Sequence, residues 1–174
     1  ALLTGDTKLE RLFLQNFAVS DGFENHPAGA IPMCYPADEL RGRFIPNWAM
    51  WLVLGLEDRM FNRKKDSEFV LSFRKRIYDL LDWFKRYENS DGLLERLPSW
   101  VFVEWSEANN LVQDINFPTN MLYARTLRAA GHIFGDGSLM NKAERLQRVI
   151  RERSFDGEFF ADNLIYVDGK AESS

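Results

Sequence analysis

The segment PNWAMWLVLGL (residues 46–56) decides the class of fold. Pro46 suits the first turn of a helix, where its missing N–H and fixed φ cost nothing. The residues after it are apolar almost without interruption, so a helix that begins here is apolar nearly all round and has to be buried on several sides. Such a helix needs helical neighbours, which the rest of the chain should supply.

Apolar residues recur at helical spacing in four further segments, over about 7–18, from Ser67 toward Asp91, from Pro118 to Gly135, and over 139–153. Asp66 and Ser67 can cap the second of these, which we expect to be one long helix. These segments predict an all-α fold of antiparallel helical hairpins in a single domain, residues 1–174. Residues 20–44, rich in glycine and proline, form a long loop that we expect to line a site. Residues 163–174 are a tail, and its last residues, 170–174, should fray.

Composition excludes several classes of function. The net charge of −4 is spread as mixed signs, so neither nucleic acid nor an anionic membrane is a favoured partner. Cys34 is the only cysteine, and His26 and His132 are too few for a metal cluster, so we expect no disulfide, metal or cofactor. The chain begins without methionine or a signal-like segment, and we expect it to be a piece of a longer protein.

The segment LPSWVFVEW (97–105) carries the chemistry. It places Glu104 between Trp100 and Trp105 in what we predict to be an exposed connection. An indole offers a flat face to the C–H bonds of a sugar ring, and a carboxylate can hold a pair of hydroxyls. The alternative is that both tryptophans are buried in the helical core.

Three polar residues near the start of the fourth helix are further candidates. Asp114, Asn116 and Asn120 flank a helix N-terminus, where side chains and free N–H groups can face a pocket. Binding and plain capping both explain Asp114 and Asn116. Trp48, which opens the second helix, is expected at the edge of the same pocket.

Four segments together resemble a known family: IPNWAMW (45–51), LDWF followed by DGLL (81–84 and 91–94), WVFVEW (100–105) and NFPTNMLYA (116–124). Their order and spacing are similar to those of the catalytic domain of bacterial α-L-rhamnosidases, the six-hairpin glycosidases built on an (α/α) barrel. The resemblance runs from Leu3 to about Asp162.

The resemblance implies hydrolysis of terminal α-L-rhamnosides with inversion, without metal or cofactor. Glu104 and Trp105 match a family motif, usually Asp-Trp, that faces the sugar. The general acid and base of the family match positions upstream of Leu3 and beyond Asp162, so this chain should contain neither and be inactive alone. The complete set of expected substrate-binding residues is Glu104, Trp105, Trp48, Asp114, Asn116, Asn120 and Trp100.

The partner that the resemblance implies is a rhamnose-containing glycan or glycoside. A fragment of a barrel also exposes helix faces, so the chain is expected to form homo-oligomers. Two other functions fit the residues: a non-catalytic helical module that binds carbohydrate or protein, and another six-hairpin glycosidase. The compartment stays undetermined, because a periplasmic, an extracellular and a cytoplasmic parent protein all fit the sequence.

Overall fold

The computed structural model describes residues 7–18, 26–35, 43–63, 66–105, 112, 114–168 and 170–173. The described residues form mainly helices, which are α1 (Lys8–Ala18), the short 3₁₀ helix η2 (Pro46–Trp48), α2 (Ala49–Asn62), α3 (Ser67–Leu71), α4 (Arg74–Lys85), α5 (Phe117–Phe134) and α6 (Gly137–Ser154). Three short strands are added, β1 (Ile115–Asn116), β2 (Asn163–Val167) and β3 (Lys170–Ser173). The predicted all-α class is confirmed. None of the described helices is both long and apolar enough to cross a membrane.

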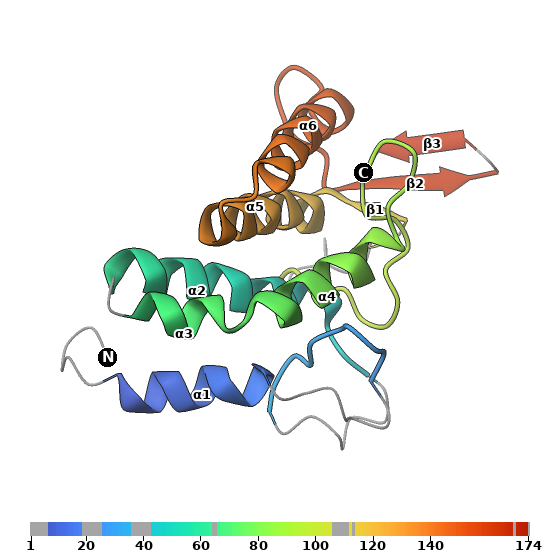
Figure 1. Ribbon diagram of the computed structural model, residues 1–174. Coiled ribbons are helices and arrows are strands. Elements are labelled where there is room, and N and C mark those ends of the chain that lie inside the picture. The colour runs from blue at the N-terminus through green and yellow to red at the C-terminus, as the bar shows by residue number, and fades with distance from the viewer. Residues whose placement is uncertain are drawn as a thin grey trace.

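The helices are stacked, as Figure 1 shows. α6 packs on α5, α5 packs on α2, and α2 is followed by α3 and α4, which lie along it. α1 lies on the far side of this stack from α6. The two helical hairpins, α2 with α3–α4 and α5 with α6, therefore make up the body of the molecule.

The core runs along α2 and α5. Met50, Val53 and Leu56 of α2 are fully buried, as the continuous apolar segment predicts. Small residues of α5 let α6 approach closely, because a Cβ at Gly131 would stand 2.6 Å from the Met140 side chain. One side of α2 stays open, and Trp51 there is 60% exposed.

The long third helix is in fact two helices, which corrects the prediction. α3 ends at Leu71 and α4 begins at Arg74. Ser72 at the break donates its hydroxyl to the Phe69 carbonyl at 2.6 Å, a local bond that competes with helical pairing. The Asp66 side chain does not cap α3, because its carboxylate pairs with Arg59 of α2 instead.

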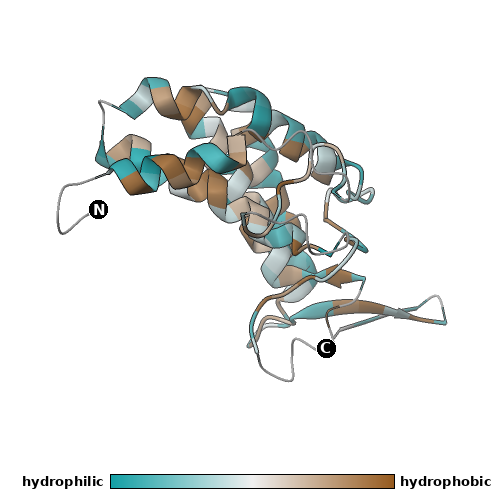
Figure 2. Cartoon of the chain, turned by 90° about the horizontal axis from the view of Figure 1, so that it is seen from below, coloured by the Kyte–Doolittle hydropathy of each residue, from teal (hydrophilic) through white to brown (hydrophobic). Residues whose placement is uncertain are grey.

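The C-terminal residues form a β-hairpin rather than a fraying tail. β2 pairs antiparallel with both β1 and β3, in the order β1-β2-β3. The β-branched and aromatic residues Ile165, Tyr166 and Val167, followed by the turn signal Asp168-Gly169, explain the hairpin. Figure 2 shows it extending away from the helices. The expectation for residues 170–173 was therefore wrong.

The described part of the 20–44 loop is anchored by a buried arginine. Arg76 of α4, 5% exposed, donates to the carbonyls of Ala30 at 2.7 Å and Phe17 at 3.2 Å. Gly29 has a φ of +88°, and a Cβ there would meet the Asp79 carbonyl at 2.9 Å. The remaining residues of the loop, 20–25 and 36–42, lie outside the described part of the chain.

The same loop makes stability depend on pH. Burial, and then the charge of Arg76, hold the pKa of His26 below its usual value of 6.5. As the pH falls through about 6.5, His26 is therefore protonated more readily in the unfolded chain than in the folded one. The folded state loses stability as a result. We expect urea unfolding midpoints to decline from pH 7 to pH 5, and to decline less in His26→Asn. Parallel declines in the two proteins would contradict this assignment.

Candidate functional site

Three of the predicted tryptophans meet around one buried ring. Phe102 is 7% exposed, and the rings of Trp48, Trp100 and Trp105 stand edge-on to it with centroids 5.7, 5.1 and 4.8 Å away. The tryptophans are 41%, 46% and 86% exposed, in the same order. We call these four residues the aromatic cluster. The structure thus brings together Trp48, Trp100 and Trp105, and it leaves their indoles at the surface rather than in the core.

The segment that carries the cluster is fixed to the start of α2. The amide of Asn47, 4% exposed, donates from Nδ2 to the Phe102 carbonyl at 2.7 Å. The Trp100 N–H donates to the Phe44 carbonyl at 3.2 Å, and the Phe44 N–H donates to the Ser99 hydroxyl at 2.9 Å. Asn47 was missed in the sequence, although a polar residue opening an apolar helix is a signal that could have identified it.

Glu104 precedes the most exposed indole of the cluster. Its side chain is exposed, and within the described part of the chain it makes neither a hydrogen bond nor an ion pair. The carboxylate is thus open to hydroxyls of a ligand that lies against Trp105.

A cavity of about 330 Å³ lies beside the segment that carries the cluster, and Val101 of that segment is in its lining. One part of its lining is aliphatic and the other is polar. The lining residues are Leu94, Leu97, Val101 and Val112 on the aliphatic part and Arg96, Asp114, Asn116 and Thr119 on the polar part. This mixed lining can accommodate a small ligand that has both an apolar and a hydroxylated edge.

Arg96 and Asp114 form a doubly bonded pair in the cavity wall. The Arg96 N–H donates to the Asp114 carbonyl, and its Nε donates to Oδ1 of the same residue, both at 2.7 Å. The Tyr166 N–H donates to Oδ2 of Asp114 at 2.8 Å. The Tyr166 N–H and the Arg96 side chain hold the pKa of the Asp114 carboxyl below its usual value, so the carboxylate is charged at neutral pH.

Backbone strain is concentrated beside the same cavity. Arg96 and Asp114 have φ values of 51° and 29°, and Ser99, between the lining residues Leu97 and Val101, has a φ of 67°. A non-glycine residue in this region costs on the order of 1–3 kcal/mol, and such residues gather at binding and catalytic sites. The strain supports a functional use of this cavity.

The amides of Asn116 and Asn120 are used within the protein. Asn116 accepts from the Thr119 N–H at 2.9 Å, which caps α5, and donates to Asn163 Oδ1 at 2.9 Å. Asn120, 1% exposed, accepts from the Leu94 N–H and donates to the carbonyls of Leu94 and Asn116. Asn116 is therefore a capping residue in the cavity wall, and Asn120 lies behind that wall. We keep neither as a ligand-binding side chain.

Sequence reasoning missed Thr119, which lines the cavity beside Asn116. Its side chain is 2% exposed, and its hydroxyl has no hydrogen-bond partner among the described residues. No pattern in the sequence marks this residue, because its isolation depends on what the rest of the chain brings to the cavity.

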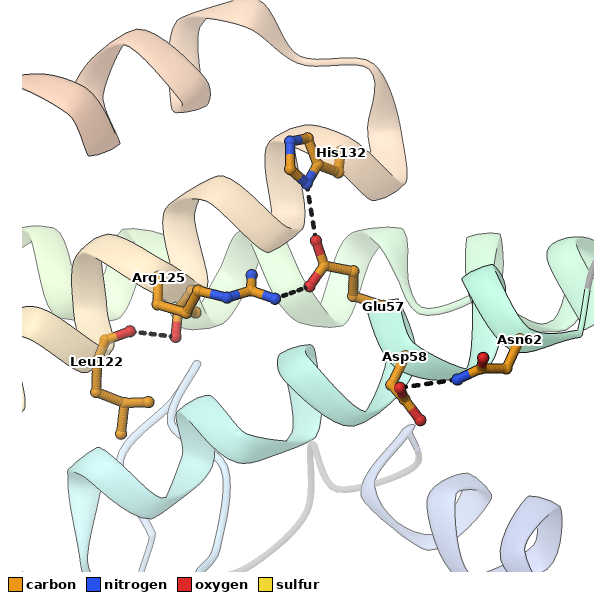
Figure 3. Close-up of polar contacts among 7 residues, drawn as sticks. Glu57, Asp58, Asn62, Leu122, Arg125 and His132 are labelled. Carbon is orange, nitrogen blue, oxygen red and sulfur yellow. Dashed lines mark hydrogen bonds and ion pairs between the residues drawn. The ribbon is translucent and has the colours of Figure 1, made fainter. Parts of the chain in front are cut away.

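A second group of polar side chains joins α2 to α5. It lies further along α5 than the cavity does. Figure 3 shows Glu57 of α2 between Arg125 and His132 of α5. The Glu57 side chain is 4% exposed and pairs with Arg125 at Oε2 and with His132 Nδ1 at Oε1, the latter at 2.8 Å. Both carboxylate oxygens serve contacts between the helices, so we assign this group to packing. Among the described residues no group of His, Cys, Asp and Glu could hold a metal ion.

Another cavity, of about 350 Å³, lies between α1 and α2. Its lining is almost wholly apolar and includes Phe13, Trp48 and Trp51, with Glu10 as the charged member. Trp48 was expected at the edge of the pocket beside Asp114, but it lines this cavity instead. A hydroxylated ligand would find few hydrogen-bond partners there. The cavity at Arg96 and Asp114 is the better candidate site.

The stacked hairpins and the small sheet define a glycoside hydrolase-like fold. One solved structure with a similar fold is a GH78 family rhamnosidase of Bacillus sp. GL1, which superposes with a TM-score of 0.75 at 18% sequence identity. The match covers 91% of this chain and 17% of that protein. By sequence alone, no protein family and no curated protein matches the chain. At this identity the likeness establishes the fold.

Proposed function

We propose that this chain forms a sugar-binding wall of a glycoside hydrolase that removes terminal α-L-rhamnosyl groups with inversion. The observation that carries the proposal is the exposed aromatic cluster with Glu104 next to Trp105, on a segment whose Val101 lines a cavity of mixed character. The fold shared with a GH78 rhamnosidase supports the class of reaction.

The cavity suits one sugar ring that has an apolar edge. Its volume, about 330 Å³, lies at the small end of the range for ligand sites. Leu94, Leu97 and Val101 offer an aliphatic surface, while Arg96 and Asp114 offer a donor and an acceptor. Rhamnose is a 6-deoxyhexose, with a methyl group at one end of the ring and hydroxyls around the rest. In the proposed complex the methyl group faces the aliphatic surface.

In the proposed complex, Trp105 and Glu104 contact the part of the ligand that lies outside the cavity, because neither residue lines it. The Trp105 indole stacks against the C–H face of the sugar, and the Glu104 carboxylate accepts from neighbouring hydroxyls. Together these contacts orient the ring for an acid and a base that the resemblance places outside this chain. The chain alone is therefore expected to bind rhamnose without hydrolysing rhamnosides.

Replacing Trp105 by alanine should weaken binding of L-rhamnose about twofold to tenfold, since an aromatic contact contributes roughly 0.5–1.5 kcal/mol beyond its area. The measurement is a titration followed by ¹H–¹⁵N NMR. Trp51→Ala is the matched control, because Trp51 is also exposed but lies on α2 outside the aromatic cluster. The chain should also prefer L-rhamnose to L-mannose, which carries a 6-hydroxyl instead of the methyl group. Equal losses in the two variants, or no preference for the deoxy sugar, would argue against this site.

A non-catalytic carbohydrate-binding module is the second candidate. Both oxygens of Asp114 already accept hydrogen bonds, and within the described residues no second carboxylate lines the cavity. Binding alone would need no more than this. Hydrolysis of p-nitrophenyl α-L-rhamnoside by the intact parent protein separates the two candidates, because a module without catalytic partners leaves the substrate unchanged.

A further inference from the structure

We propose that the Thr119 hydroxyl is a specificity-determining group that hydrogen-bonds one hydroxyl of the bound sugar in the cavity. The inference rests on the proposed function, because it requires a sugar in the cavity lined by Arg96 and Asp114. It adds a residue that neither the sequence pattern nor the likeness of fold indicates.

The hydroxyl of Thr119 differs from that of another buried threonine on the same helix. Thr126, 0% exposed, donates to the Leu122 carbonyl one turn earlier at 2.8 Å, which is the usual solution for a threonine inside a helix. Thr119, 2% exposed, has no such bond. A buried hydroxyl without a partner is destabilising, so its retention on a cavity wall points to a partner that the ligand supplies.

The surroundings hold Thr119 in place. Its N–H donates to the Asn116 side chain at 2.9 Å, and Asn116 is itself held by Asn163. The adjacent Leu94 is held by the Asn120 amide at both its N–H and its carbonyl. The backbone that carries the hydroxyl is therefore held before a ligand arrives, and little backbone freedom is lost on binding.

The position favours a neutral hydroxylated ligand. A sugar hydroxyl both donates and accepts, so it can satisfy a threonine hydroxyl in either direction. The charges of Arg96 and Asp114 in the same cavity are paired with each other, so the cavity has no unpaired positive charge to favour phosphates or carboxylates. Aliphatic side chains such as Leu97 and Val101 make part of the cavity apolar, and a hydrogen bond made in such a place discriminates against a ligand that lacks the hydroxyl.

Three variants of the 174-residue chain test the inference, with L-rhamnose as the probe. Thr119→Val keeps the shape and removes the hydroxyl, and we expect its Kd to rise roughly tenfold while the unfolding temperature of the free protein rises. Thr119→Ser keeps the hydroxyl and should bind within about twofold of the unaltered chain. Thr126→Val is the matched control: it should lower the unfolding temperature and leave the Kd unchanged.

The outcomes separate the inference from the proposed function. Unchanged binding in Thr119→Val, with Trp105→Ala still weakened, overturns the role of Thr119 and leaves the sugar site standing. The role also fails if Thr119→Ser loses affinity as fully as Thr119→Val, because the hydroxyl then does not matter. If the unaltered chain binds no sugar at all, the proposed site and the inference fall together.

Discussion

Replacement of Arg59 by methionine is expected to lower the free energy of unfolding by about 3 kcal/mol, because the buried Asp66 then keeps only Arg11, 3.9 Å away, and Glu10 loses its pair. The Arg59 side chain is 0% exposed and joins three helices. Its guanidinium nitrogens stand 2.8 Å from Glu10 of α1 and 2.9 Å from Asp66 before α3, as ion pairs without the angles of hydrogen bonds. Methionine fills the space, so the lost charge dominates the effect.

Two comparisons make the Arg59 result specific. Adding Asp66→Asn to Arg59→Met should recover part of the loss, because Asp66, 7% exposed, then carries no unpaired charge. Lys75→Met is the surface control: Lys75 pairs with Asp79 at 2.6 Å, but its side chain is 78% exposed, and the change should stay within about 0.5 kcal/mol. Chemical denaturation measures all four proteins. A loss in Arg59→Met no larger than in Lys75→Met would show that the buried pairs contribute nothing to stability.

The second large effect is expected for Asn120→Asp, which should lower the free energy of unfolding by about 3 kcal/mol or more at pH 7. The Asn120 amide donates to the Leu94 carbonyl at 3.0 Å and the Asn116 carbonyl at 2.9 Å. A carboxylate has the same shape but cannot donate, so it would face two carbonyl oxygens in a buried site. Protonation of the introduced carboxylate restores one hydrogen-bond donor. The loss of stability should therefore become smaller as the pH falls.

Asn62→Asp is the matched control for Asn120. Asn62 is exposed at the end of α2 and donates to Asp58 at 2.8 Å, as Figure 3 shows. A change there should cost no more than about 1 kcal/mol, from repulsion by Asp58 and from a negative charge at the C-terminal end of α2. Unfolding at pH 5 and pH 7 gives both numbers. If Asn120→Asp unfolds like the unaltered chain yet loses rhamnose affinity, the amide is a ligand-binding group and the structural role assigned to it is wrong.

The helices that local patterns specify agree with the structure. Asn116 and Pro118 mark the start of α5, and Gly135, with a φ of +65°, ends it. The same holds for the start of η2 at Pro46. Capping, proline geometry and left-handed glycine act over a few residues, so the sequence carries them directly. The break between α3 and α4 was missed, since a serine that bonds to its own helix resembles any other polar residue in the pattern.

The candidate site, like the fold, was predicted only in part from the sequence. The sequence alone predicts that the chain is helical, that residues 46–56 form a helix buried on several sides, and that Trp100, Glu104 and Trp105 belong to one exposed segment. The tertiary structure decided that Trp48 joins them around Phe102, that Asn120 turns inward to Leu94, and that the Thr119 hydroxyl is left alone beside Arg96 and Asp114. The partner of a polar side chain comes from a distant segment, and local periodicity carries no record of which segment that is.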